Sequence, residues 1–142
     1  MKSFSITPEF VDIIPEHVHE RKLYICERYK IAVHKCCCGC GEEVVTPLTP
    51  VDWSISRHGD SVSMRPSIGN WSFDCKSHYW IRRNQVVWAG SMTELEIKRV
   101  QAKDKADKEA YITAVNRQKH QRKLPLSWIS NIWNVIKSLW PF

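Results

Sequence analysis

The chain contains no long apolar run. Residues 1–9 lack the apolar stretch that opens a secretory signal peptide. The apolar segment near the C-terminus, residues 127–140, is too short and too often interrupted by polar residues to span a bilayer. We therefore expect a cytoplasmic protein in a reducing compartment, where its 6 cysteines are not paired in disulfides.

The first two thirds of the chain also lack any excess of charge. Residues 1–95 carry 11 Lys or Arg and 11 Asp or Glu, whereas residues 96–142 carry 10 basic and 4 acidic residues. The net charge of +6 thus belongs to the second part, and we expect a domain boundary at residues 95/96. The basic residues there alternate with Asp104, Asp107 and Glu109, which favours a solvated helix over a nucleic-acid-binding surface.

No segment before residue 90 shows helical periodicity over three turns. Short runs of β-branched, aromatic and alternating residues predict strands instead, and two hairpins are expected at the turns His58-Gly59-Asp60 and Arg83-Asn84. Four tryptophans within this part are assigned to its core. They are Trp53, Trp71, Trp80 and Trp88.

Proline and glycine are absent from residues 92–122, which predicts a helix, and Thr93 with Glu96 fits a capping box at its start. A second, amphipathic helix is expected over residues 127–140, with three tryptophans on its apolar face. Its polar face carries one lysine, Lys137, so we expect it to dock on protein rather than on a membrane. The predicted fold class is α+β: a small β-rich zinc-binding domain of antiparallel hairpins (residues 1–95), followed by a basic helical extension (residues 96–142).

The zinc expectation comes from a cluster of thiols. The segment His34-Lys35-Cys36-Cys37-Cys38-Gly39-Cys40-Gly41 places thiols at alternate positions, and Cys75-Lys76-Ser77-His78 adds one thiol and one imidazole. Thiolate and imidazole at short spacing, with a second cluster across a loop, are typical of a tetrahedral zinc site.

An extended strand cannot bring alternate thiols onto one ion, because alternate side chains lie roughly 6–7 Å apart and two thiolates on zinc must approach within about 4 Å. The chain must therefore bend, at Gly39 and Gly41, and Cys37 would then point away from the ion. Two ligand sets remain open. Either four cysteines close the coordination shell, or three of them do so with His78. The four cysteines are Cys36, Cys38, Cys40 and Cys75.

Several motifs together resemble one family of proteins. They are His34 to Glu43, Thr46-Pro47, Pro66 to Trp71 and Cys75 to Ile81. This pattern, within residues 20–90, is similar to that of the BubE family, a bacterial family associated with ubiquitin-like modifiers and their activating and conjugating enzymes. The resemblance implies a zinc-containing peptidase of antiphage defence that processes or removes a ubiquitin-like modifier, with that modifier and its conjugating machinery as partners.

Two peptidase mechanisms are compatible with the residues. If cysteines alone hold the metal, Ser67 or Ser77 can be a nucleophile with His34 or His78 as its base. Ser67 would then lie in a tight turn over residues 65–70, and Asn70 could orient a histidine or cap that turn.

The second mechanism needs an open position on the metal. A zinc-bound water would then be the nucleophile, with Glu42 or Glu43 as its general base. A cysteine-rich shell favours the serine mechanism, because metallopeptidases generally use histidine and carboxylate ligands. A different class of function is a non-catalytic zinc module that binds a ubiquitin-like protein or a conjugating enzyme.

Overall fold

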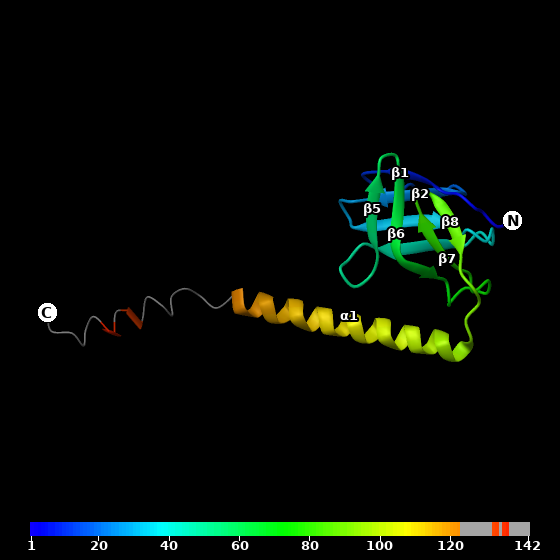
Figure 1. Ribbon diagram of the computed structural model, residues 1–142. Coiled ribbons are helices and arrows are strands. Elements are labelled where there is room, and N and C mark those ends of the chain that lie inside the picture. The colour runs from blue at the N-terminus through cyan, green and yellow to red at the C-terminus, as the bar shows by residue number, and fades with distance from the viewer. Residues whose placement is uncertain (123–131, 134, 137–142) are drawn as a thin grey trace. The chain divides into compact units, whose positions relative to one another are not determined.

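The computed structural model of the chain describes residues 1–122, 132, 133, 135 and 136 (Figure 1). It divides into two units, Met1–Val100 and Gln101–Phe142. Most of the predicted amphipathic helix over residues 127–140 lies outside the described residues. The four that are described there are helical and exposed. Within the described part, no helix combines the length and the apolar character needed to cross a membrane.

The first unit contains two sheets of four strands (Figure 1). In the first sheet β1 pairs with β2 in parallel, and the other neighbours are antiparallel. Its strands are β1 (Thr7–Phe10), β2 (Lys22–Cys26), β3 (Ile31–Lys35) and β4 (Glu43–Pro47).

The second sheet is antiparallel throughout and contains both predicted hairpins. Gly59 has φ 62° in the β5–β6 turn, and Arg83 and Asn84 both have positive φ in the β7–β8 turn, as a two-residue hairpin requires. Its strands are β5 (Ser54–His58), β6 (Ser61–Gly69), β7 (His78–Arg82) and β8 (Gln85–Trp88).

The main core contains buried side chains from both sheets. Leu23 and Ile25 of β2 join Met64 of β6 and Tyr79 and Ile81 of β7 in one hydrophobic cluster. Along β7, Tyr79 and Ile81 are buried while His78, Trp80 and Arg82 are not. Because successive side chains of a strand point to opposite faces, these last three residues lie on the outer face of the second sheet.

The structure corrects two expectations. Residues 65–70 do not form the predicted tight turn, because β6 continues to Gly69. The register between β6 and β7 shifts between Met64 and Ile68, so the chain bulges without leaving the sheet. Trp71 and Trp80 are half-buried and are not part of the core, whereas Trp53 and Trp88 pack against it.

The predicted helix is α1 (Glu94–Arg122). The capping box is confirmed, because Glu96 Oε2 accepts hydrogen bonds from the backbone N–H and the hydroxyl of Thr93, each 2.8 Å long. None of the residues of α1 is buried. Two small β-sheets followed by a C-terminal helix confirm the α+β class.

Candidate active site and metal centre

The thiol-rich segment forms the turn between β3 and β4. Gly39 and Gly41 both have φ 86°, which confirms the bend predicted at the glycines. The turn is closed by the backbone N–H of Gly39, which donates to Cys36 O at 3.1 Å, and Cys40 N donates to Cys38 Sγ at 3.3 Å. The bend places three thiols on the same side of the turn.

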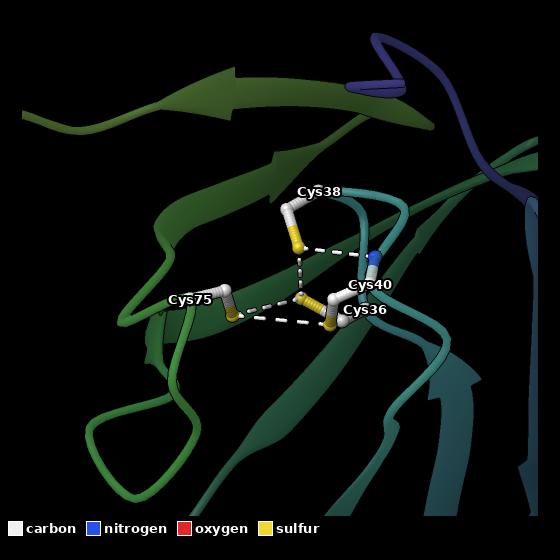
Figure 2. Close-up of side chains that lie close together, drawn as sticks. All are labelled: Cys36, Cys38, Cys40 and Cys75. Carbon is white, nitrogen blue, oxygen red and sulfur yellow. Dashed lines mark hydrogen bonds between the residues drawn. The ribbon is translucent and has the colours of Figure 1, made fainter.

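The fourth thiol, Cys75, comes from the loop between β6 and β7 in the other sheet (Figure 2). Its Sγ lies 3.9 Å from both Cys36 Sγ and Cys40 Sγ, and Cys36 Sγ lies 3.4 Å from Cys38 Sγ. All four sulfur atoms lie within 4.8 Å of one another. The group therefore joins the two sheets at one end of the unit.

These distances fit a tetrahedral metal ion. Zn–S bonds of about 2.3 Å separate the sulfurs of a tetrahedral site by about 3.8 Å. Four thiolates at this spacing suit zinc and leave no coordination position for water. The structure places His78 elsewhere, and among the described residues the possible metal ligands that gather here are the four cysteines.

Ser77 and Asn70 support this group of thiols from the interior. The Ser77 hydroxyl lies 3.0 Å from Cys36 Sγ and 3.4 Å from Cys75 Sγ. Asn70 Nδ2 donates to Ser77 Oγ at 3.0 Å and lies 3.6 Å from Cys36 Sγ. Because the Ser77 oxygen accepts from Asn70, its own proton is free to point at a thiolate. Ser77 and Asn70 thus belong to the surroundings of the metal centre.

The local environment shifts the pKa values of three of these thiols in different directions. Burial raises the pKa of Cys36 and of Cys38. Burial also opposes ionisation of Cys75, but hydrogen bonds from the side chain and backbone of Ser77 outweigh it and lower the pKa of Cys75 to about 7. Cys75 therefore ionises more readily than Cys36 or Cys38, and the thiolate is the form that binds a metal ion.

On the outer face of the second sheet, Ser67 and His78 form a hydrogen-bonded pair. His78 Nε2 lies 2.9 Å from Ser67 Oγ. His78 is the register partner of Gly69 on β6, so Ser67 is its diagonal neighbour across the two strands. A serine hydroxyl in hydrogen-bond contact with an imidazole nitrogen is the arrangement that activates a serine nucleophile.

Neighbouring residues restrict both members of the pair. The indole of Trp71 packs against the His78 ring with centroids 5.0 Å apart. Gly69 makes this possible, because a Cβ there would lie 2.4 Å from the Trp71 ring. Trp53 Nε1 donates to Ser67 O at 3.4 Å and fixes the backbone of the serine. His78 Nδ1 is buried and has no hydrogen-bond partner among the described residues.

The other candidate histidine, His34, lies inside the protein. Its side chain is fully buried on β3, and its Nε2 lies 2.7 Å from the hydroxyl of Tyr79. Burial lowers the pKa of His34 to about 4, so the ring is neutral at neutral pH. Across the described residues no hydrogen bond joins His34 to either Ser67 or Ser77.

Three further residues considered in the sequence lie apart from the Ser67–His78 pair. Glu42 is exposed, and its backbone carbonyl accepts a hydrogen bond from Cys36 N at 2.8 Å. Glu43 pairs with Lys35 at 3.4 Å. Cys37 lies in the hydrophobic core, where burial raises its pKa to about 12.

Sequence reasoning missed two contacts of the site. Trp71 was expected in the core, yet it packs on His78, and the signal was the glycine two residues before it. Tyr79 was not singled out, although its hydroxyl is the partner of His34 and lies 3.5 Å from Asn70 Nδ2. No short-range pattern connects Tyr79 to His34, which lies 45 positions earlier.

Comparison with known families gives one match. Residues 10–89, more than half of the chain, match the model of a family described as "Bacterial ubiquitination-like system serine protease (BubE)". The matched segment includes all four clustered cysteines, Ser67 and His78. Comparison with curated proteins and with solved structures gives no match.

Proposed function

Because the chain belongs to the BubE family of serine proteases of bacterial ubiquitination-like systems, we propose that it is a serine peptidase that processes or removes a ubiquitin-like modifier. The observation that carries the proposal is the 2.9 Å contact between Ser67 Oγ and His78 Nε2. These two residues are the nucleophile and the general base.

The reaction follows from the positions of the two side chains. Ser67 Oγ attacks the carbonyl carbon of the scissile bond while His78 Nε2 takes the hydroxyl proton. The same nitrogen then gives that proton to the leaving amine, and the peptide C–N bond breaks to leave an ester on Ser67. Water, deprotonated by His78, hydrolyses the ester and restores the serine. Packing of Trp71 on the imidazole keeps Nε2 directed at Ser67.

The cysteine cluster supports a structural role for metal. Zinc held by Cys36, Cys38, Cys40 and Cys75 would supply folding free energy, because four thiolates complete a tetrahedral shell. That arrangement leaves Glu42 without a zinc-bound water to deprotonate. Ser77 touches the thiols, and the next residue, His78, touches Ser67, so the metal centre fixes the strand end that presents the base.

A binding module without catalysis would not need the Ser67–His78 contact. A closed metal shell alone is compatible with such a module, but a hydroxyl–imidazole pair beside it favours a hydrolase. We further propose that the protein acts in the cytoplasm, in antiphage defence, with the modifier and its conjugating enzymes as partners. The family's place in a ubiquitination-like system supports the modifier and its conjugating enzymes as partners.

The test uses zinc-loaded full-length protein with a ubiquitin-like modifier that carries a C-terminal extension. Cleavage is followed by intact mass, and reactivity of Ser67 by labelling with a fluorophosphonate. We expect Ser67→Ala and His78→Ala each to lower the cleavage rate at least about a thousandfold. Both variants should keep one zinc per chain, because neither residue belongs to the cysteine cluster.

Ser72→Ala is the matched control, since Ser72 is exposed and lies close to Ser67 in the chain. It should cleave and label at the wild-type rate. A Ser67→Ala variant that cleaves normally would show that the serine mechanism is wrong. Loss of zinc from His78→Ala would show that His78 is a metal ligand rather than the base.

A further inference from the structure

A basic groove lies on the same outer sheet face as Ser67 and His78. It has a volume of about 850 Å³ and is lined by residues of β5 to β8 and of the β7–β8 turn. Among the described residues, its lining includes Arg65, Arg82, Arg83 and His58 and contains no Asp or Glu. The unit that holds it has balanced charge over residues 1–95, so three arginines here are a local concentration of positive charge.

The groove begins next to the catalytic pair. Trp80 lines it and lies two positions after His78 on the same face of β7. A strand rises about 3.3 Å per residue, so Trp80 lies about 7 Å from His78 along the strand, and Arg82 about 13 Å. Arg65 lies two positions before Ser67 on β6, about 7 Å along the strand, so an extended substrate chain held at Ser67 reaches the arginines about two to four residues from the scissile bond.

An aromatic ring holds one of the three guanidinium groups, and the ion pairs of the described residues neutralise none of them. The guanidinium of Arg82 lies over the Trp80 ring, 4.8 Å from its centroid. Arg83 N donates to Ser63 Oγ at 2.9 Å, which attaches the β7–β8 turn to β6. Within the described part of the chain, the ion pairs involve none of the three arginines of the groove.

Two further hydrogen bonds attach the same turn to β6. Asn84 N donates to Val62 O at 3.0 Å, and Val62 N donates to Asn84 Oδ1 at 2.9 Å. The groove is therefore largely preformed, and ligand binding does not have to order its walls. Val87, 39 % exposed, adds apolar surface between the charges.

We infer that this groove binds an extended acidic segment of the protein substrate, with an Asp or Glu about two to four residues from the scissile bond. The inference rests on the proposed peptidase function, because the bound segment is a substrate only if Ser67 and His78, from which the groove continues, cleave it. Guanidinium groups recognise carboxylates through paired hydrogen bonds, and Trp80 and Val87 contact the apolar parts of the chain.

A nucleic acid is the less favoured occupant. The groove adjoins a serine–histidine pair, whose chemistry acts on acyl groups. Residues 1–95 together have no net charge to attract a polyanion from a distance. An acidic peptide needs only the local arginines.

The binding test uses the zinc-loaded full-length Ser67→Ala protein, which binds substrate without cleaving it. The probe is a dye-labelled decapeptide of alternating Ala and Glu, compared with the same peptide containing Gln in place of Glu. Fluorescence anisotropy should show at least about tenfold tighter binding of the Glu peptide at low ionic strength, and the difference should shrink as salt is added.

Arg82→Gln and Arg65→Gln should each weaken binding of the Glu peptide about fivefold and leave binding of the Gln peptide unchanged. Arg28→Gln is the matched control, because Arg28 is exposed and lies outside the groove, in the turn between β2 and β3. Equal binding of the two peptides would overturn the inference. So would a dye-labelled DNA oligonucleotide that binds more tightly than the Glu peptide and displaces it.

A separate measurement distinguishes this inference from the proposed function. Wild-type protein is labelled with a fluorophosphonate at Ser67 in the presence and absence of the Glu peptide. If the Glu peptide slows labelling of Ser67, and the Arg82→Gln substitution removes this inhibition, the result supports both the peptidase function and the groove. Labelling of Ser67 that the peptide does not affect contradicts the groove alone. Arginine-dependent peptide binding without any labelling contradicts the peptidase and leaves the groove as a binding surface.

Discussion

At the scale of single residues, Gly69 controls the setting of the proposed base. It faces His78 across β6 and β7, and the indole of Trp71 occupies the space where its side chain would be. The imidazole thus has Ser67 at one nitrogen and the Trp71 indole beside it, with 63° between the two ring planes. In a serine–histidine–carboxylate triad an acid orients the ring. Here the described contacts assign that task to packing.

Gly69→Ala tests this arrangement. The new methyl group would meet three atoms of the Trp71 indole at 2.4–2.5 Å, so the indole must move and the His78 ring loses its support. We expect the rate of Ser67 labelling by a fluorophosphonate to fall between about tenfold and a hundredfold, with zinc content unchanged. Gly90→Ala is the control, because nothing lies within 4 Å of a Cβ at Gly90. Wild-type labelling by Gly69→Ala would contradict a positioning role for Trp71.

At the scale of elements, the cysteine turn and the β6–β7 loop form one clamp between the two sheets. The turn follows β3 in the first sheet, and Cys75 precedes β7 in the second. Ser77 is hydrogen-bonded to the thiols and directly precedes His78, so the link between the sheets reaches the proposed base. Metal binding and the position of the base are therefore connected through the start of β7.

Cys75→Ser should break this clamp. It removes the one ligand contributed by the second sheet, and binding at a structural thiolate site is worth on the order of 10 kcal/mol of folding free energy. We expect zinc below one equivalent by metal analysis and a melting temperature lowered by more than about 10 °C. Asp74→Asn, at an exposed neighbouring position, should retain both. If the Cys75→Ser protein binds one zinc per chain and melts cooperatively at the wild-type temperature, Cys75 has no structural role as a ligand.

The elements also show how far the sequence predicts this protein. Both hairpins of the second sheet were predictable, because Gly59 and the Arg83-Asn84 pair mark two-residue turns between alternating strands. The end of β6 was not, because proline and glycine in residues 65–70 resemble a turn, whereas pairing with β7 keeps the segment in the sheet. β1 depends on parallel pairing with β2, which leaves no short-range signal.

The same contrast applies to the site. Cys36, Cys38 and Cys40 were predictable as one group, because their spacing with glycine leaves few other uses for three thiols. The sequence left open whether His34 or His78 serves Ser67, and only the pairing of β6 with β7 places His78 beside it. The packing of Trp71 depends on the space above Gly69, which no periodicity indicates.

At the scale of the whole molecule, the proposed serine–histidine site and the cysteine cluster that could hold a metal ion both lie in the first unit, Met1–Val100. The family match over residues 10–89 falls within this unit as well. Helix α1 contributes no buried residue, and its surface carries an ion pair between Lys103 and Asp107 at 2.8 Å. The folding stability of the first unit should thus be independent of residues 101–122 of the helix.

A chain that ends at Val100 should test this independence. We expect it to bind one zinc, to melt within about 2 °C of the full-length protein, and to label at Ser67 at the full-length rate. The physical reason is that removal of residues 101–142 exposes no buried side chain of α1. The full-length protein, measured in parallel, is the reference. Loss of zinc or of labelling would show that the second part of the chain is needed to complete the first.

The arrangement of the four thiols also has a consequence for the order of folding. Cys36, Cys38 and Cys40 lie within five residues, whereas Cys75 is 35 positions away from Cys40. An unfolded chain can therefore hold a metal ion with three thiolates, and the entropy of closing the long loop is lost only when Cys75 joins. A partly coordinated ion also stabilises the unfolded chain, so zinc should raise the free energy of unfolding less than its affinity for the folded protein suggests.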